Sequence, residues 1–357
     1  MRILLIRLRL IGDVVFTTPV IRALRRLRPD AHLAYVVEPR AAPVVVGNPH
    51  LDEVIVAPDP RVSGRLLADL ALARRLRAGR YDLVLDLHGG PRSALLTWAT
   101  GARRRVGYAV SGRGWMYTEH VARPRALRAR HSVQNQWDLL TPLGAGAPDP
   151  DRDPTEMAVS PEAAAAVATK LGAAGIDPAD RPVIVVHVSA GNPFRRWPAS
   201  AFVALLTQLV AREPRRRIVV ISGPSEHLAA RTVGAQARSA LGVTGEAVVD
   251  GVEFDLAELR ALMDVAALFI GGDSGPLHVA GTSEVPVVGL YGPTLAARSA
   301  PWRAASCVTE SLEWTDLACR PCDQRRCVPG DFRCLSGLAP ERVAAAAERA
   351  LTRSGRT

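Results

Sequence analysis

The chain has 357 residues, 48% hydrophobic and 22% charged, which suits a soluble globular protein of two domains. No uncharged apolar run approaches the roughly 18 residues of a membrane span, so a membrane-spanning protein is excluded. Three arginines interrupt the N-terminal apolar run, which lacks a small-residue cleavage site. We therefore expect a first strand there, not a signal peptide, and a cytoplasmic protein.

The net charge of +10 is concentrated in the first part of the chain. Residues 1–150 hold 23 arginines against 12 carboxylates, whereas residues 151–357 are nearly balanced. Codon bias explains why Lys170 is the only lysine, but it does not explain this asymmetry. The basic half predicts an acidic partner: a phosphorylated glycan, an anionic lipid surface or nucleic acid. Nucleic acid is the least favoured, because an aromatic content of 5% leaves few rings for stacking.

Short apolar runs alternate with helical patterns from the first residues onward. Arg2–Leu10 predicts a strand, Gly12-Asp13 a turn, and Val14–Leu27 a helix with apolar residues at helical spacing. Further strands are predicted at 34–37, 54–56 and 83–87, with a helix at 65–78. The arginine-rich stretch from Arg103 to Tyr108 is expected to be irregular.

A stretch rich in Gly, Pro and Asp, residues 144–154, marks the expected domain boundary and predicts domains at 1–158 and 159–357. The alternation restarts beyond it, with strands at 183–188, 217–222, 265–270 and 285–290, and a last helix at 340–352. Such alternation predicts parallel sheets with right-handed crossovers. The predicted fold is therefore α/β, with two Rossmann-like, doubly wound domains.

The segment from Asp264 to Thr294 predicts a ligand site. It reads as strand, glycine turn, short helix and strand, the order that places ligands at the carboxyl ends of parallel strands. Glycines such as Gly275 let a phosphate approach the backbone, and Asp273, Ser274 and His278 add polar side chains. A structural turn with Asp273 as the helix N-cap fits the same pattern.

Polar residues also follow other predicted strands. Asp13 follows the first strand, where a carboxylate can act as a general base or as a helix N-cap. Arg195 and Arg196, just beyond Ser189, fit a diphosphate clamp but also a pair of solvated arginines. Beyond the turn at Gly223, Glu226 fits a ribose contact or an ordinary first-turn helix acid.

Four of the five cysteines form a C-x2-C-x4-C-x6-C cluster. Four thiolates at this spacing fit a structural zinc site, while two disulfides or four reduced thiols fit the same pattern. Neighbouring arginines are expected to favour thiolates. The members of this cluster are Cys319, Cys322, Cys327 and Cys334.

Several motifs resemble glycosyltransferase family 9, the ADP-heptose:lipopolysaccharide heptosyltransferases. Gly12-Asp13 with Thr17, Pro19 and Val20 resembles the opening motif of this family. Later matches, which extend the similarity to about residue 345, are Arg195-Arg196-Trp197-Pro198, Gly223-Pro224 with Glu226, Gly272–Pro276 with His278 and Ala280, and Val287–Thr294. The family usually has lysine where Arg195 stands.

The resemblance implies a GT-B fold, in which two Rossmann-like domains face a central cleft and the N-terminal one binds the acceptor. It implies an inverting, metal-independent transfer that requires no cofactor. Asp13 would be the general base, with Gly12 and Thr17 on the acceptor side. The donor would be bound by Ser189, Arg195, Arg196, Gly223, Glu226, Asp273, Ser274, Gly275 and His278.

We therefore expect a glycosyltransferase that moves a sugar, heptose from ADP-heptose, to an anionic saccharide or lipid-linked glycan. Such a reaction belongs to cell-envelope polysaccharide or lipopolysaccharide synthesis. We also expect peripheral contact with the cytoplasmic face of the inner membrane and no nucleic-acid partner. The alternative is a catalytically inactive nucleotide-sugar- or glycan-binding protein on the same fold.

Overall fold

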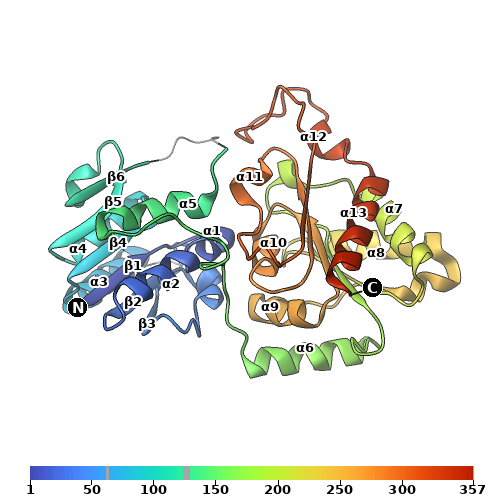
Figure 1. Cartoon of the computed structure of the whole chain (residues 1–357), viewed down its shortest axis with the longest axis horizontal. Helices are drawn as coiled ribbons and strands as arrows, with labels where there is room; N and C mark the ends of the chain where they lie inside the picture. The colour runs from blue at the N-terminus through green and yellow to red at the C-terminus, as the bar shows by residue number, and fades with distance from the viewer. Residues whose placement is uncertain (62–63, 124–128, 357) are drawn as a thin grey trace. The chain divides into compact units, whose positions relative to one another are not determined.

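The computed structural model describes residues 1–61, 64–123 and 129–356. The chain divides into two compact units, Met1–Ala158 and Val159–Thr357, each an α/β layer structure (Figure 1). Helices cover both faces of each sheet. Across the described ranges, no helix has the length and apolar character needed to cross a membrane.

The first unit is built on a six-stranded sheet in which every neighbouring pair is parallel. Its strand order is β3-β2-β1-β4-β5-β6. The strands are β1 (Arg2–Ile6), β2 (His32–Val37), β3 (Glu53–Val56), β4 (Leu83–Asp86), β5 (Arg104–Ala109) and β6 (Glu119–Ala122). The helices are α1 (Ile11–Val15), α2 (Thr18–Leu27), α3 (Arg65–Ala78), α4 (Pro91–Ala99) and α5 (Ser132–Trp137), with 3-10 turns η1 (Pro39–Val44), η2 (Gly114–Met116) and η3 (Asp138–Leu143).

The second unit repeats this topology. Its parallel sheet has the order β12-β11-β10-β7-β8-β9, the same winding once the strands are renumbered within the unit. The strands are β7 (Val183–His187), β8 (Arg217–Ile221), β9 (Val248–Val249), β10 (Leu268–Gly272), β11 (Val287–Tyr291) and β12 (Thr309–Glu313). The helices are α6 (Pro161–Ala173), α7 (Ala199–Arg212), α8 (His227–Leu241), α9 (Leu256–Val265), α10 (Gly275–Ala280), α11 (Ala296–Ser299), α12 (Arg333–Ser336) and α13 (Pro340–Ser354), with 3-10 turns η4 (Pro193–Arg195) and η5 (Gly242–Ala247).

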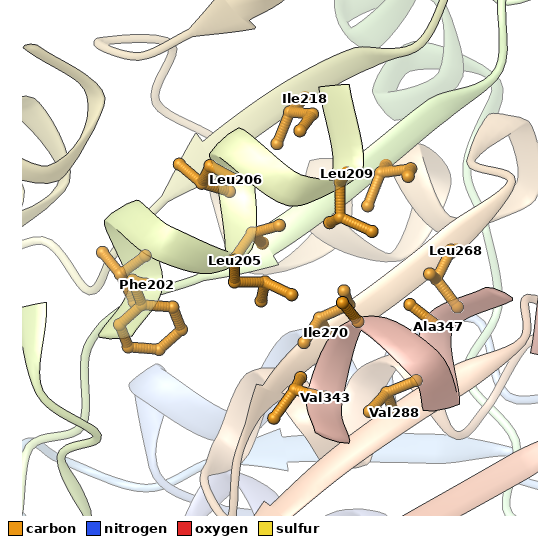
Figure 2. Close-up of a cluster of buried hydrophobic side chains, with 14 of the residues drawn as sticks. Phe202, Leu205, Leu206, Leu209, Ile218, Leu268, Ile270, Val288, Val343 and Ala347 are labelled. Atoms are coloured by element: carbon orange, nitrogen blue, oxygen red, sulfur yellow. The ribbon is translucent and has the colours of Figure 1, made fainter. Parts of the chain in front are cut away.

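Apolar side chains of strands and helices form the core of each unit. In the second unit, alternate residues of β10 and β11 pack against α7 and α13, as Figure 2 shows for Ile270 and Val288 against Val343. Strands covered on both faces must be apolar throughout, which explains why the predicted strands are continuous apolar runs. The prediction of two Rossmann-like, doubly wound α/β domains is confirmed.

Three local predictions were wrong. The predicted helix 14–27 is two helices, and Gly12-Asp13 lies inside α1 rather than in a turn. The stretch predicted as irregular from Arg103 forms β5, whose arginines point their charge to solvent-side carboxylates and carbonyls, as in the pair Arg104–Glu119. β5 is paired on both sides, with β4 and β6, and its arginine charges are satisfied by partners that lie far along the chain, which local periodicity does not show.

Candidate active site

Both sheets change their winding direction between two central strands, and the predicted site residues gather at these points. In the first unit the change lies between β1 and β4, and in the second between β7 and β10. Ligands of doubly wound sheets bind outside the carboxyl ends of such strands. Asp13 follows β1, Ser189 and Arg195 follow β7, and Asp273 follows β10 directly.

Asp13 is held in place by a partly buried arginine, Arg7. Arg7 leaves the end of β1, and its Nη2 lies 2.6 Å from Asp13 Oδ2, while its Nη1 donates to the Leu87 carbonyl beyond β4 at 2.6 Å. The Arg7 side chain is 11% exposed and that of Asp13 is 37% exposed. Asp13 stands at the third position of α1, not at its N-cap, which is Leu10. The carboxylate is therefore fixed by a charge behind it and open to solvent in front.

The other predicted acceptor-side residues lie behind this carboxylate. Gly12 is buried within α1. Thr17 is fully buried, and its hydroxyl donates to the Val14 carbonyl at 2.7 Å and bonds the Tyr35 hydroxyl at 2.6 Å. These contacts hold the α1–α2 junction against β2, so Thr17 supports the site without reaching its surface.

The loop after β4 completes the first-unit site. Asp86 is fully buried and accepts hydrogen bonds from the backbone of His88 and Gly89, from Ser93 and from Tyr117. Burial raises the pKa of Asp86, which those hydrogen bonds oppose. Burial, reinforced by the charge of Arg7, lowers the pKa of His88 to about 4, so its imidazole is neutral at pH 7.

In the second unit the arrangement of charges is reversed. Asp273 is buried, and its carboxylate contacts Arg195 Nη1 at 3.3 Å, His278 Nε2 at 3.4 Å and Thr294 Oγ1 at 2.5 Å. Burial opposes ionisation of Asp273, but the hydrogen bond and charge of His278, helped by Arg195, lower its pKa to about 2. Asp273 is not the N-cap of α10, a position that Ser274 occupies. The carboxylate is thus an ionised anchor for its neighbours.

Arg195 is held on three sides. Its Nη1 donates to the Asp273 carbonyl at 3.1 Å as well as facing the carboxylate, and its Nε donates to Gln324 Oε1 at 2.7 Å. Within the described residues, Arg195 Nη2 has no protein partner, and the side chain is 29% exposed. The guanidinium is therefore held in a fixed orientation, and its Nη2 is free to donate hydrogen bonds to an anion.

The two adjacent arginines do not form one clamp. Arg196 turns toward β8, where its Nη2 lies 2.6 Å from Glu226 Oε1 and its Nε donates to the Ala190 carbonyl. Ser189 accepts from the Gly223 backbone N–H at 2.8 Å, which ties the β7 loop to the β8 turn. The structure therefore brings together two neighbouring groups, Arg195 with Asp273 and Arg196 with Glu226.

The glycine turn itself is closely packed. A Cβ on Gly272 would lie 3.2 Å from the Arg195 carbonyl oxygen, so a side chain there would push the η4 backbone away. Ser274 Oγ donates to the Gly272 carbonyl at 3.2 Å, and Gly275 begins α10. Glycine at 272 is thus explained by backbone approach to Arg195.

The structure does not support the zinc alternative for Cys319, Cys322, Cys327 and Cys334. All are free thiols, and within the described ranges no group of three or more His, Cys, Asp or Glu residues is arranged to hold a metal ion. Cys322 Sγ instead accepts the backbone N–H of Gln324 at 3.3 Å. Burial raises the pKa of Cys334, and Cys319 and Cys327 add to this rise, so the protonated thiol is favoured there despite nearby Arg320.

Sequence patterns missed four supporting residues. Arg7 and Asp86 each had a signal, a charge at the end of an apolar strand, which must find a partner when buried. His187 ends β7 and is buried, which lowers its pKa to about 4. Gln324 has no local signal, because its role depends on a contact with a residue 129 positions away.

Residues 70–330 match the family model described as "Glycosyltransferase family 9 (heptosyltransferase)". The chain is 29% identical over 299 residues to lipopolysaccharide heptosyltransferase 3 of Escherichia coli. The aligned residues make up 83% of this chain and 84% of that protein. The chain resembles the crystal structure of a family 9 glycosyl transferase from Veillonella parvula with a TM-score of 0.83 and 24% identity, over 98% and 97% of the two chains. E. coli heptosyltransferase WaaC, solved with ADP, superimposes with a TM-score of 0.70 at 18% identity, over 98% and 100%.

Proposed function

The chain belongs to glycosyltransferase family 9, and from this premise we propose that it transfers heptose from ADP-heptose to an anionic, lipid-linked glycan. The resemblance to this family noted in the sequence is confirmed, and the protein is a glycosyltransferase. Its two domains have the GT-B fold of heptosyltransferases that act in lipopolysaccharide synthesis. The donor, the acceptor, the inverting course and the independence from metal are the proposal.

One observation carries the proposal: the two sheets have the same strand order, and each carries an Arg–Asp ion pair where its winding changes direction. The more exposed partner is the carboxylate in the first unit and the guanidinium in the second. A carboxylate faces outward in the first unit, as a general base requires. A guanidinium faces outward in the second, as a departing diphosphate requires. The solved structure of E. coli WaaC with ADP supports adenosine diphosphate as the leaving group.

These placements support a transfer in a single displacement. Asp13 accepts the proton of an acceptor hydroxyl, whose oxygen attacks the anomeric carbon of the donor as the bond to the ADP oxygen breaks. Arg195 stabilises the charge that develops on the leaving diphosphate, with the backbone N–H groups of Ser274 and Gly275 beside it. Attack opposite the leaving group inverts the anomeric centre. Glu226 accepts from the ribose hydroxyls, and Arg196 orients Glu226.

Three of the predicted donor residues act from behind. Asp273 is buried and holds Arg195, and the buried His278 contacts the Asp273 carboxylate in turn. Ser189 holds the β8 turn at Gly223. Fixed charges of this kind avoid the reorganisation that water would need around the leaving group. We propose that these residues position the donor contacts.

Calorimetric titration with ADP, UDP, GDP and CDP, with and without chelator, tests the donor. We expect preference for ADP that the chelator does not change. Transfer from ADP-heptose to a deacylated lipopolysaccharide fragment, followed by proton NMR of the new linkage, tests the reaction and its stereochemistry. Preference for another nucleotide would refute the donor, and ADP binding without transfer to any acceptor would favour a glycan-binding protein.

A further inference from the structure

The outer faces of α3 and α4 carry an unusual set of exposed apolar side chains. Inward-facing Leu72, Leu76 and Leu96 pack in the core of the first unit. The opposite faces should be polar in a helix that meets only water. Instead they expose six large apolar residues, which we call the α3–α4 patch: Leu66 (77% exposed), Leu67 (75%), Leu70 (46%), Leu95 (52%), Trp98 (47%) and, from η2, Trp115 (63%).

These residues form one continuous surface. Trp98 and Trp115 contact edge to face, with ring centroids 5.7 Å apart. Leu70 and Trp98 line the same surface depression of about 360 Å³. Leu66 and Leu67 lie one helical turn before Leu70 on α3, and Leu95 lies one turn before Trp98 on α4. Six of the sixteen exposed large apolar residues among those described are therefore gathered here.

Arginines surround the patch without acidic partners. Arg74, Arg77 and Arg105 line the same depression, and no described carboxylate forms an ion pair with any of them. Arginines of α3 outside the depression are paired, as Arg75 is with Glu53 at 2.8 Å. The unpaired cations therefore coincide with the exposed leucines and tryptophans.

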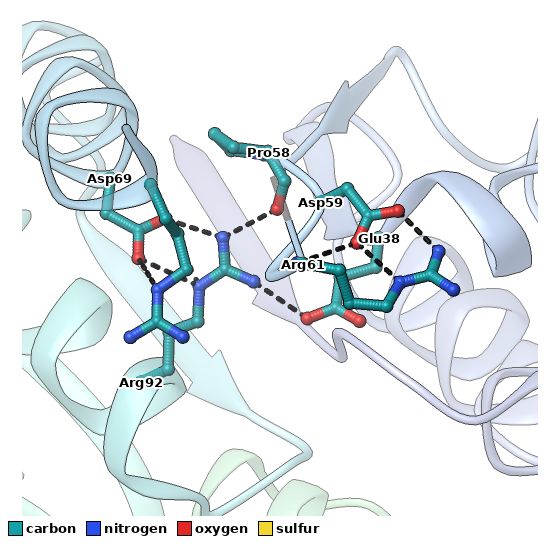
Figure 3. A network of polar contacts seen from close by, with 7 residues as sticks. Glu38, Pro58, Asp59, Arg61, Asp69 and Arg92 are labelled. Atoms are coloured by element: carbon teal, nitrogen blue, oxygen red, sulfur yellow. Dashed lines mark hydrogen bonds and ion pairs between the residues drawn. The ribbon is translucent and has the colours of Figure 1, made fainter. Parts of the chain in front are cut away.

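A network of ion pairs keeps the two helices in register (Figure 3). Arg92, in the first turn of α4, donates to Asp69 of α3 at 2.5 Å, to Glu38 at 2.7 Å and to the Pro58 carbonyl at 2.8 Å. The side chains of Arg92, Asp69 and Glu38 are each at most 20% exposed. The patch is thus a preformed surface and needs no ordering before it binds.

We propose that the α3–α4 patch docks on the surface of an anionic lipid bilayer. Tryptophan and leucine enter the interfacial layer, while arginine remains at the level of the phosphates and contributes electrostatic attraction. This inference deepens the proposed function, on which it rests for a lipid-bearing partner, because a docked enzyme meets an acceptor held in the same membrane.

Charge and ring geometry favour this occupant over two others. A second copy in a two-fold interface would place the same unpaired arginines opposite each other, at a cost in repulsion. Single-stranded nucleic acid needs ring faces on which bases stack, whereas Trp98 and Trp115 meet at 70° and the leucines would gain nothing. An anionic bilayer satisfies both the cations and the apolar side chains.

Vesicle flotation with the full chain tests the proposal, using phosphatidylcholine vesicles with and without phosphatidylglycerol. We expect binding to the anionic vesicles only, weakened by salt, with a blue shift of tryptophan fluorescence. Each cation near an anionic surface changes partitioning about fivefold, so Leu70→Gln with Arg74→Glu should weaken binding at least 25-fold, roughly the effect of two charge units.

The second unit supplies a matched control. Leu228 is 70% exposed on α8, and Arg231, three residues on, is exposed and has no described acidic partner. Leu228→Gln with Arg231→Glu makes the same substitutions away from the patch and should leave vesicle binding unchanged. A single Arg77→Glu variant, expected to lose about 25-fold from the charge alone, checks the result without altering a leucine.

Three outcomes would overturn the proposal: no binding of the wild-type chain to anionic vesicles, equal loss in both double variants, or binding that Leu70→Gln with Arg74→Glu leaves intact. Self-association abolished by that variant, without vesicle binding, would assign the patch to a second copy instead. ADP affinity and transfer to a water-soluble acceptor should be unchanged in the patch variants. Failure of the wild type in those two assays would refute the proposed function and leave the vesicle result standing.

Discussion

The two units use the same strand order to present opposite charges. In the first, Arg7, the less exposed partner, supports an outward-facing Asp13. In the second, a buried Asp273 supports an outward-facing Arg195. An ion pair fixes both partners, and which partner is buried decides which charge the surface offers. One fold thus provides a proton acceptor at one sheet and an anion contact at the other. Substitutions that remove a member of one ion pair, or a contact that orients it, test the two roles separately.

The largest effect is expected for the exposed carboxylate. Asp13→Asn removes the proton acceptor while keeping its shape, so kcat should fall about 10²- to 10⁴-fold, the usual contribution of a general base. The dissociation constant for ADP, measured by calorimetry, should stay within about twofold, since Arg195 still meets the diphosphate. A parallel loss of ADP affinity would contradict the general-base assignment.

Removing the buried carboxylate should cost stability. Asp273→Asn leaves Arg195 and His278 without their anion, and we expect the free energy of unfolding of the second unit to fall by about 3 kcal/mol in urea. Asp180→Asn, which breaks the exposed Arg181–Asp180 pair of the same unit, is the control and should cost about 0.5 kcal/mol or less. Equal losses in the two variants would refute the anchor role.

The same carboxylate predicts a pH dependence. Its pKa is lowered from 3.8 to about 2 in the folded protein, so its contribution is present above pH 3.8 and is lost as the pH falls through about 2. The stability difference between wild type and Asp273→Asn, followed by urea unfolding at decreasing pH, should therefore shrink across this window. A constant difference would show that ionisation of Asp273 does not contribute.

The outward-facing guanidinium should matter for the donor. Arg195→Ala should weaken ADP binding by about 1.5–3 kcal/mol, the usual contribution of a hydrogen bond to a charged group. Arg181→Ala removes an exposed arginine paired only with its sequence neighbour Asp180 and should leave the affinity unchanged. An unchanged dissociation constant for Arg195→Ala would remove the diphosphate contact from the mechanism.

The smallest effect is expected for the residue that orients Arg195. Gln324→Ala deletes the acceptor of Arg195 Nε and should weaken ADP binding by about 0.5–1.5 kcal/mol. Gln208→Ala, which removes an exposed bond to Glu341, is the matched control. If Gln324→Ala matched Arg195→Ala in size, Gln324 would have to contact the nucleotide itself.

Local pattern predicted eight of the twelve strands that the described residues form, because apolar runs and glycine turns are set by neighbouring residues. It missed β5, β6, β9 and β12. It placed Asp13, Ser189, Glu226 and Asp273 after the correct strands. It did not predict that Arg195 and Arg196 turn to different partners, and it left open whether the cysteines bind zinc, form disulfides or remain free thiols. Those outcomes depend on which distant groups approach, and spacing along the chain carries no such information.

The amino-acid sequence alone therefore determined the two Rossmann-like halves, the edges on which polar residues gather and the family motifs. Tertiary structure decided which member of each ion pair is buried, that Thr17 supports the site from behind, and that α3 and α4 bring leucines, tryptophans and unpaired arginines to one surface. Periodicity reports which face of an element is apolar, whereas burial and pairing are properties of elements already packed together.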